Sequence, residues 1–273
     1  MNPGIFDTVF ERSPASESYS ALAAAGFSCV QAHLPIVGAD PWSGEPFNLE
    51  RVDALRQAAD GANVRISALD GAFNMAHPDP DVREAGLRGI EQVIAAASRI
   101  GTRFVTLCTG TRERSSMWKW HAENGSDNAW QDATATIRCA LELAESREIT
   151  LLVEPEPANI ASSAPVARQL LDEMGSPFLK IVLDPANMVL SDRSRDPETV
   201  LAEGFDLLGP DIVFAHAKDL SVDNQFCAAG TGIVPWERYW EMLRGIGYDG
   251  DVIFHTLTEA DVPRALSVFR TAL

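Results

Sequence analysis

Short apolar runs alternate with longer amphipathic segments eight times along the chain. Several short runs are apolar without interruption, such as residues 151–153 before Glu154 and residues 181–183 before Asp184. Strands of a parallel sheet have this pattern, because helices cover the sheet on both faces. The runs predict strands over residues 4–9, 28–33, 64–69, 103–108, 150–154, 179–184, 212–216 and 252–255.

The amphipathic segments between these runs predict helices. Asn48 precedes one of them in an N-cap position, and Gly26 and Gly101 follow two others, where glycine commonly ends a helix. The predicted helices cover residues 16–25, 49–59, 81–99, 132–147, 164–174, 197–207, 236–244 and 261–271.

The repeated strand–helix alternation predicts an α/β fold, a single (β/α)8 TIM barrel domain over residues 1–273. A doubly wound open sheet is the alternative architecture. That fold requires a glycine-rich turn after its first strand, and the Val-Phe-Glu-Arg segment at residues 9–12 contains no glycine. The closed barrel is therefore favoured.

Four apolar strands end in a polar side chain, namely Glu154, Asp184, His216 and His255. Barrel enzymes carry their chemistry at these C-terminal strand ends. Two carboxylates on adjacent strands repel one another unless a cation or a shared proton lies between them. A divalent metal held by these four side chains resolves the repulsion. The alternatives are a metal-free polar cluster and acid–proline turns at Glu154-Pro155 and Asp184-Pro185.

Further polar and aromatic residues fall in the same predicted strand ends and loops. All five histidines do so, which predicts a histidine-lined site. Glu156 lies two residues after Glu154, and Lys218 lies two residues after His216. Each either shares the face of that strand-end residue or lies in a solvated loop. Trp118 lies in a long loop that either covers a sugar ring or packs on the protein. The candidate substrate-binding residues are His33, His77, Arg112, Trp118, His121, Glu156, Asn187 and Lys218.

The glycines at 230 and 232 indicate a tight turn rather than a phosphate-binding loop.

The charge balance narrows the choice of partner. A net charge of −17 disfavours nucleic acids and anionic membrane surfaces, so we expect a small-molecule substrate. The four cysteines form no CxxC pair, residues 1–14 lack the apolar segment of a signal peptide, and no apolar run approaches the ~18 residues of a membrane span. We expect a cytoplasmic protein, with homo-oligomerisation left open.

Several short motifs make the chain resemble the xylose-isomerase-like barrels grouped as sugar (or sugar-phosphate) isomerases and epimerases. They are Leu-Leu-Val-Glu-Pro at 151–155, Ile-Val-Leu-Asp-Pro-Ala-Asn at 181–187, His-Ala-Lys-Asp at 216–219, Ala-Gly-Thr-Gly-Ile-Val-Pro-Trp at 229–236 and Gly-Tyr-Asp-Gly at 247–250. The resemblance implies a metal bound by Glu154, Asp184 and His216. The chain departs from the family pattern at His255, where a glutamate is expected, at Asn187, which replaces a histidine, and at residues 222–224, which lack an arginine.

The resemblance implies an isomerase or epimerase that moves a proton alpha to a carbonyl of a small sugar, polyol or keto acid. A dehydratase on the same scaffold, a non-catalytic ligand-binding barrel and a nuclease are the alternatives, of which the negative charge disfavours the last. Two carboxylates and two imidazoles predict Zn, Fe, Co, Ni or Mn rather than Mg. We assign Glu154 and His255 as the candidate catalytic residues, with His255 acting as a ligand or as an acid/base.

Overall fold

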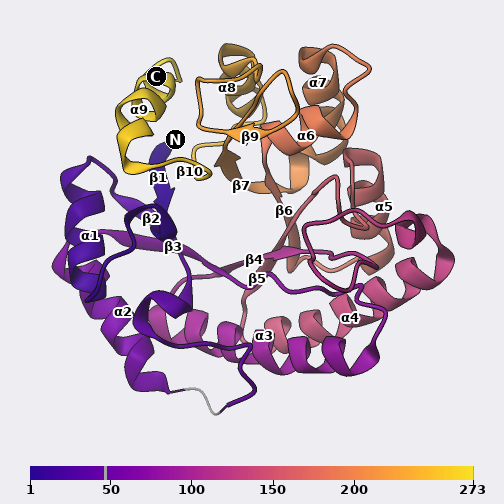
Figure 1. Cartoon of the computed structure of the whole chain (residues 1–273), viewed down its shortest axis with the longest axis horizontal. Helices are drawn as coiled ribbons and strands as arrows, with labels where there is room; N and C mark the ends of the chain where they lie inside the picture. The colour runs from indigo at the N-terminus through magenta and orange to yellow at the C-terminus, as the bar shows by residue number, and fades with distance from the viewer. Residues whose placement is uncertain (46–47, 273) are drawn as a thin grey trace.

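The structure, a computed structural model, describes residues 1–45 and 48–272. Eight parallel strands close into a barrel in the order β1-β10-β7-β6-β5-β4-β3-β2 (Figure 1). The predicted (β/α)8 architecture is therefore confirmed. The barrel strands are β1 (Asn2–Phe6), β2 (Cys29–Ala32), β3 (Arg65–Asp70), β4 (Phe104–Cys108), β5 (Thr150–Glu154), β6 (Leu179–Leu183), β7 (Ile212–Ala217) and β10 (Asp251–Phe254).

Helices surround the barrel on its outside (Figure 1). They are α1 (Ala15–Ala24), α2 (Leu49–Gly61), α3 (Pro80–Ile100), α4 (Asp127–Glu145), α5 (Ala164–Met174), α7 (Pro197–Leu208), α8 (Trp236–Gly245) and α9 (Val262–Arg270). The side chain of Asn48 caps α2 by accepting a hydrogen bond from the Glu50 amide, and Gly101 ends α3 with a φ of 91°. Among the described residues, no helix is both long and apolar enough to span a bilayer.

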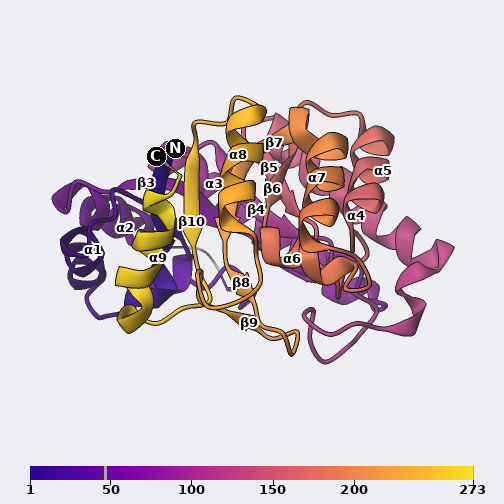
Figure 2. The ribbon, with the colours of Figure 1, turned by 90° about the horizontal axis from the view of Figure 1, so that it is seen from above.

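The structure differs from the predicted elements in a few places. The predicted strand 4–9 is shorter, because residues from Asp7 turn into the 3₁₀ segment η1 (Asp7–Phe10). Helix α4 begins five residues before the predicted start, because the Ser126 side chain caps it. A short helix, α6 (Pro185–Ser191), and a small antiparallel pair, β8 (Asp219–Leu220) with β9 (Phe226–Cys227), were not predicted. Figure 2 shows this pair projecting from the end of the barrel away from the chain termini.

A compact apolar layer fills the barrel interior. Its buried members come from six different strands and pack against one another: Cys29, Ala68, Leu152, Val182, Phe214 and Ile253. Side chains two residues apart on a strand point to the same face. The next inward-facing residue on each of these strands therefore lies directly above this floor, at the C-terminal mouth.

Candidate metal centre and cavity

The layer above the apolar floor is polar on every one of these strands. Gln31, Asp70, Glu154, Asp184, His216 and His255 each follow a floor residue by two positions. Because strand direction is the same throughout a parallel barrel, all six side chains face the mouth. The barrel geometry thus gathers in one layer polar groups that are far apart in the sequence.

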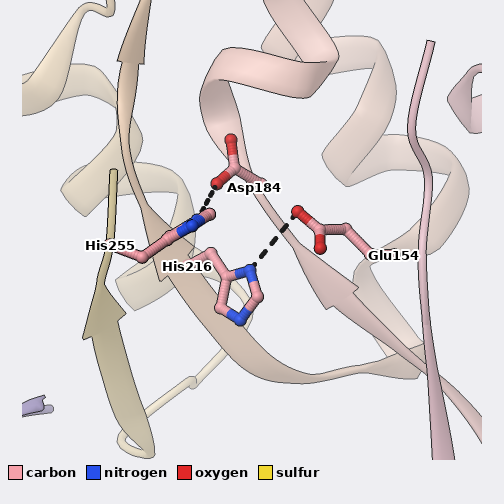
Figure 3. Close-up of side chains that lie close together, drawn as sticks. All are labelled: Glu154, Asp184, His216 and His255. Carbon is pink, nitrogen blue, oxygen red and sulfur yellow. Dashed lines mark hydrogen bonds and ion pairs between the residues drawn. The ribbon is translucent and has the colours of Figure 1, made fainter. Parts of the chain in front are cut away.

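Four of these side chains form one cluster. One ligand atom from each of Glu154, Asp184, His216 and His255 lies within 4.8 Å of all the others. Nδ1 of His216 lies 3.3 Å from Oε1 of Glu154, and Nε2 of His255 lies 3.0 Å from Oδ2 of Asp184 (Figure 3). Four ligands about 2.1 Å from one ion lie roughly 3.4 Å apart in a tetrahedral arrangement, so these contacts match a metal-binding set. The four residues converge as the sequence predicted.

Gln31 and Thr106 orient the ring of His216. Its Nε2 lies 2.8 Å from Oε1 of Gln31, and the Gln31 amide in turn donates to the Thr106 hydroxyl at 3.1 Å. The Gln31 oxygen accepts the Nε2 proton, which leaves a lone pair on Nδ1. Within residues 1–45 and 48–272 this buried Nδ1 has no hydrogen-bond partner, and it points into the cluster. A buried imidazole in this state fits a metal ligand with an orienting partner.

His255 is positioned by the residue that follows it. Thr256 has a φ of 57°, a left-handed conformation that is rare for β-branched residues and costs roughly 1–3 kcal/mol. Its hydroxyl lies 3.3 Å from Nδ1 of His255, so that Nε2 faces Asp184. Burial lowers the pKa of His255 and keeps the imidazole neutral, which is the form that binds metals.

The two carboxylates are both held ionised. Burial alone would raise the pKa of Asp184, but Lys218 and His255 outweigh it and leave the pKa at about 2. The pKa of Glu154 is also lowered, because Lys218 and a protonated His216 outweigh its burial; a cation bound in the cluster would take the place of the His216 proton. Oδ1 of Asp184 caps α6 by accepting from the amides of Ala186 and Asn187, which frees Oδ2 for the cluster. The acid–proline motif here therefore caps a helix and faces the site.

Asn187 and Lys218 complete the surroundings of the carboxylates. The Asn187 amide donates to Oε1 of Glu154 at 2.8 Å. The Lys218 ammonium lies 4.0 Å from Oδ2 of Asp184, 3.9 Å from Oε2 of Glu156 and 3.9 Å from the centroid of the Phe226 ring. Burial lowers the pKa of Lys218, but the carboxylates around it raise the pKa further, so the amine stays charged.

The cluster opens onto a cavity of about 400 Å³. This volume is at the small end of the range for ligand sites. Three of the cluster residues line it directly, with Asp184 buried beside them. The other lining residues are Phe6, Gln31, Asp70, Ala72, Thr106, Leu107, Cys108, Trp118, Glu156, Lys218, Phe226, Ile253 and Thr256.

The structure brings only some of the candidate substrate-binding residues to this cavity. Trp118, Glu156 and Lys218 line it, and Asn187 reaches its edge through Glu154. His33 is not a lining residue, and its amide and Nδ1 are directed to the buried carboxylate of Asp7.

Three other candidates do not line the cavity, which corrects the prediction that every histidine does. Nδ1 of His77 accepts from the Asp79 amide, and Nδ1 of His121 accepts from the Glu123 amide, so both stabilise local turns. Arg112 donates to Asp132 at 2.6 Å and to a backbone carbonyl, and thus ties the loop to α4.

Four polar residues in the cavity wall were not among the predicted site residues, namely Asp70, Thr106, Gln31 and Thr256. Asp70 ends β3 in the same way that Glu154 ends β5, but the predicted strand stopped at residue 69. Thr106 lies inside β4 and carries no sequence signal except its inward-facing position. Extending the strand-end rule to Asp70 would have found the first of them.

Comparisons with known proteins agree with this architecture. Residues 19–272 match the family model described as the xylose isomerase-like TIM barrel. The L-ribulose-5-phosphate 3-epimerase UlaE of Escherichia coli is 25% identical over 228 residues, covering 82% of this chain and 74% of that protein. A D-tagatose 3-epimerase-like protein has the same fold, with a TM-score of 0.78 at 18% identity over 100% of this chain and 97% of the other. For a D-psicose 3-epimerase from Clostridium cellulolyticum H10 the TM-score is 0.76 at 16% identity, over 100% and 98% of the two chains. The chain therefore belongs to the family of xylose isomerase-like TIM barrels.

Proposed function

We propose that this barrel is a metal-dependent isomerase or epimerase-like enzyme that moves a proton alpha to a carbonyl of a small sugar, polyol or keto acid. The observation that carries the proposal is the cluster of two carboxylates and two imidazoles that opens onto one small cavity. The sugar epimerases among its relatives support the same class of chemistry.

The ligand set favours a divalent Zn, Fe, Co, Ni or Mn ion over Mg. Two neutral imidazoles and two carboxylates balance the charge of a divalent ion, and nitrogen ligands suit these metals better than Mg. When bound, such an ion polarises the carbonyl and hydroxyl oxygens of a substrate and so acidifies the neighbouring C–H bond.

Glu154 is the general base that the site supports best. It lines the cavity, its lowered pKa keeps the carboxylate ionised and so free to accept a proton, and the Asn187 amide fixes its orientation. His255 faces Asp184 through Nε2, so its free nitrogen is directed to the cluster rather than to the substrate. A nitrogen whose lone pair binds a metal cannot accept a proton. One base then supports isomerisation through an enediol, or loss of a beta hydroxyl, more readily than two-base inversion.

The first test is metal analysis of protein purified without chelators. We expect stoichiometric transition metal in the wild type and its loss in Glu154→Gln. In Glu142→Gln, a matched change on the outer face of α4, metal should be retained because Glu142 is exposed. Stoichiometric Mg, or full metal content in Glu154→Gln, would contradict the assignment.

The second test follows proton transfer directly. A ketose incubated with the metal-loaded protein in deuterated water should gain deuterium next to its carbonyl, and Glu154→Gln should abolish this exchange. His255→Gln should chiefly weaken metal binding. If His255→Gln kept its metal and lost exchange from only one epimer, His255 would be the second acid/base of an epimerase.

A further inference from the structure

The cavity has two chemically different halves. The four cluster residues come from β5, β6, β7 and β10, which are consecutive in the barrel. The opposite half is formed by β1 to β4 and contributes Phe6, Gln31, Asp70 and Thr106 to the cavity wall. Gln31 and Thr106 are engaged with His216 and with each other, so Asp70 is the group on this half with acceptor capacity left.

The carboxylate of Asp70 is poorly satisfied by the protein. In the described part of the chain its Oδ1 accepts two long hydrogen bonds, each of 3.4 Å, from the Thr106 hydroxyl and the Ala72 amide. In the described part of the chain no lysine or arginine forms an ion pair with it. A carboxylate has about four acceptor positions, and the half-buried Asp70 lines the cavity, so among the described residues most of these positions have no protein donor. Burial raises its pKa to about 6, as expected for an unpaired acid.

The cavity has little capacity for an anionic substrate group. Among its described lining residues Lys218 is the single lysine or arginine, and Asp184 and Glu156 already neutralise it. Asp70 and Glu154 make the wall acidic, whereas burial raises the pKa of Glu156 to about 7. Phosphates are usually bound by arginine, lysine or free backbone amides. Arg112, which the sequence made a candidate, is paired with Asp132 instead.

Part of the place where TIM barrels commonly bind phosphate is occupied by the protein itself. That place combines the loops after the seventh and eighth barrel strands, and the first of these loops comprises residues 218–236. The Asp219 carboxylate accepts from the backbone amides of Gly230 and Val234 and from the Trp236 indole, at 2.9 to 3.0 Å. A Cβ on Gly232 would lie 2.4 Å from Oδ1 of Asp219, so the loop is packed onto this carboxylate. Two amides and the indole of this loop are therefore already bound to an internal carboxylate.

We propose that Asp70 is a specificity-determining residue, which accepts hydrogen bonds from hydroxyl groups at the end of the substrate remote from the metal ligands and rejects a phosphate or carboxylate there. The substrate class is therefore an unphosphorylated polyhydroxy ketone. This inference rests on the proposed function, because it describes the same cavity. The inferred substrate class differs from that of the relative whose name specifies a 5-phosphate.

The test is calorimetric titration of the metal-loaded protein with ribulose, xylulose, fructose and tagatose, and with the terminal phosphate ester of each. We expect at least one free ketose to bind about tenfold or more tightly than its phosphate. Asp70→Asn should weaken binding of that free ketose about 10- to 100-fold, because a charged acceptor is lost, and should narrow the preference over the phosphate. Asp60→Asn, the same charge change at an exposed position on α2, should leave both affinities unchanged.

The outcomes distinguish this inference from the proposed function. Tighter binding of a phosphate ester, or no binding of any free ketose, would overturn the inference even if proton exchange were observed. Binding of a free ketose without deuterium exchange would support the inference and remove the proposed chemistry. If Asp70→Asn lost metal or melted early, the free-to-phosphate ratio in the wild type would still decide the substrate class.

Discussion

Each end of the barrel buries an aspartate, but the two aspartates differ in the partners that surround their carboxylates. At the N-terminal end, Asp251 begins β10 and is 7% exposed, and at the mouth Asp184 follows β6 and is fully buried. Arg65 binds Asp251 through two hydrogen bonds of 2.6 and 2.7 Å, Ser67 donates at 2.6 Å and Asn2 at 3.1 Å. The carboxylate of Asp251 is thereby saturated by the protein itself.

Asp184 has no such set of partners. One of its oxygens caps α6, and the other meets an imidazole nitrogen at 3.0 Å and an ammonium at 4.0 Å. Close by, Nδ1 of His216 is buried and accepts no hydrogen bond from any residue that the structure describes. Complete pairing at the N-terminal end contributes stability, whereas incomplete pairing at the mouth reserves ligand atoms for a bound cation. The comparison predicts that charge removal has different consequences at the two ends.

The largest effect is expected from Asp184→Asn. Asparagine keeps an oxygen that can cap α6 but removes the charge that a divalent ion needs. Metal should be lost, and solvent exchange into a ketose should fall by about 10³-fold or more. The metal-free variant should unfold at a lower urea concentration than the metal-free wild type, because Lys218 and His255 lose the carboxylate whose charge they stabilise. A variant that kept metal and exchange would show that the mouth is merely another polar network.

Asp251→Asn should have the reverse effect, with a large change in stability and none in metal content. The substitution removes the charged acceptor from Arg65 and Ser67. We expect the free energy of unfolding to fall by about 2 kcal/mol, since hydrogen bonds to charged groups contribute roughly 1.5–3 kcal/mol and Arg65 is half exposed. Urea titration measures the change, with Asp249→Asn as the exposed control on the preceding loop. Loss of metal in Asp251→Asn would mean that the two ends are coupled.

Gln31→Leu sharpens the comparison by testing whether the hydrogen bond from Gln31 positions the His216 ring. Without the Gln31 oxygen, the Nε2 proton has no acceptor and the ring loses its fixed orientation. Removal of such a partner typically weakens metal affinity about 10- to 100-fold, which competition with a chromogenic chelator measures. Gln31→Glu keeps an acceptor at the same place and should restore affinity. Equal weakening in both variants would assign Gln31 a packing role instead.

The sequence predicted the barrel and the cluster well because both follow from strand periodicity. Glu154, Asp184, His216 and His255 each close an uninterrupted apolar run, and parallel strands bring such ends together. The residues that hold the cluster in place were less accessible. Gln31 reaches His216 across the barrel, a contact between positions 185 residues apart that no local pattern encodes.

Loop residues were predicted least well. The sequence places three candidates in loops that follow barrel strands, namely Arg112, His77 and His121. Arg112 binds an aspartate on α4, and the two histidines accept from neighbouring backbone amides. A polar side chain in a loop binds whichever partner the loop conformation brings near, and residue type alone does not specify that conformation. The helix after Asp184 was missed for a related reason, because an acid before proline indicates a turn and the first turn of a helix equally well.

The smallest expected effect is in the pH dependence of stability. Although burial raises the pKa of Asp251, Arg65 and Ser67 outweigh it and hold the pKa below the ordinary value of 3.8. A carboxylate with a lowered pKa in the folded protein contributes stability above about pH 3.8, and this contribution is lost as the pH falls through the folded-state pKa. The difference in unfolding free energy between wild type and Asp251→Asn should therefore be constant from pH 7 to about pH 5 and shrink below about pH 4. Urea titrations of both proteins at a series of pH values would measure it. A difference that instead shrank between pH 5 and pH 7 would point to a group other than Asp251, and the N-terminal network would not be the stabilising counterpart of the mouth.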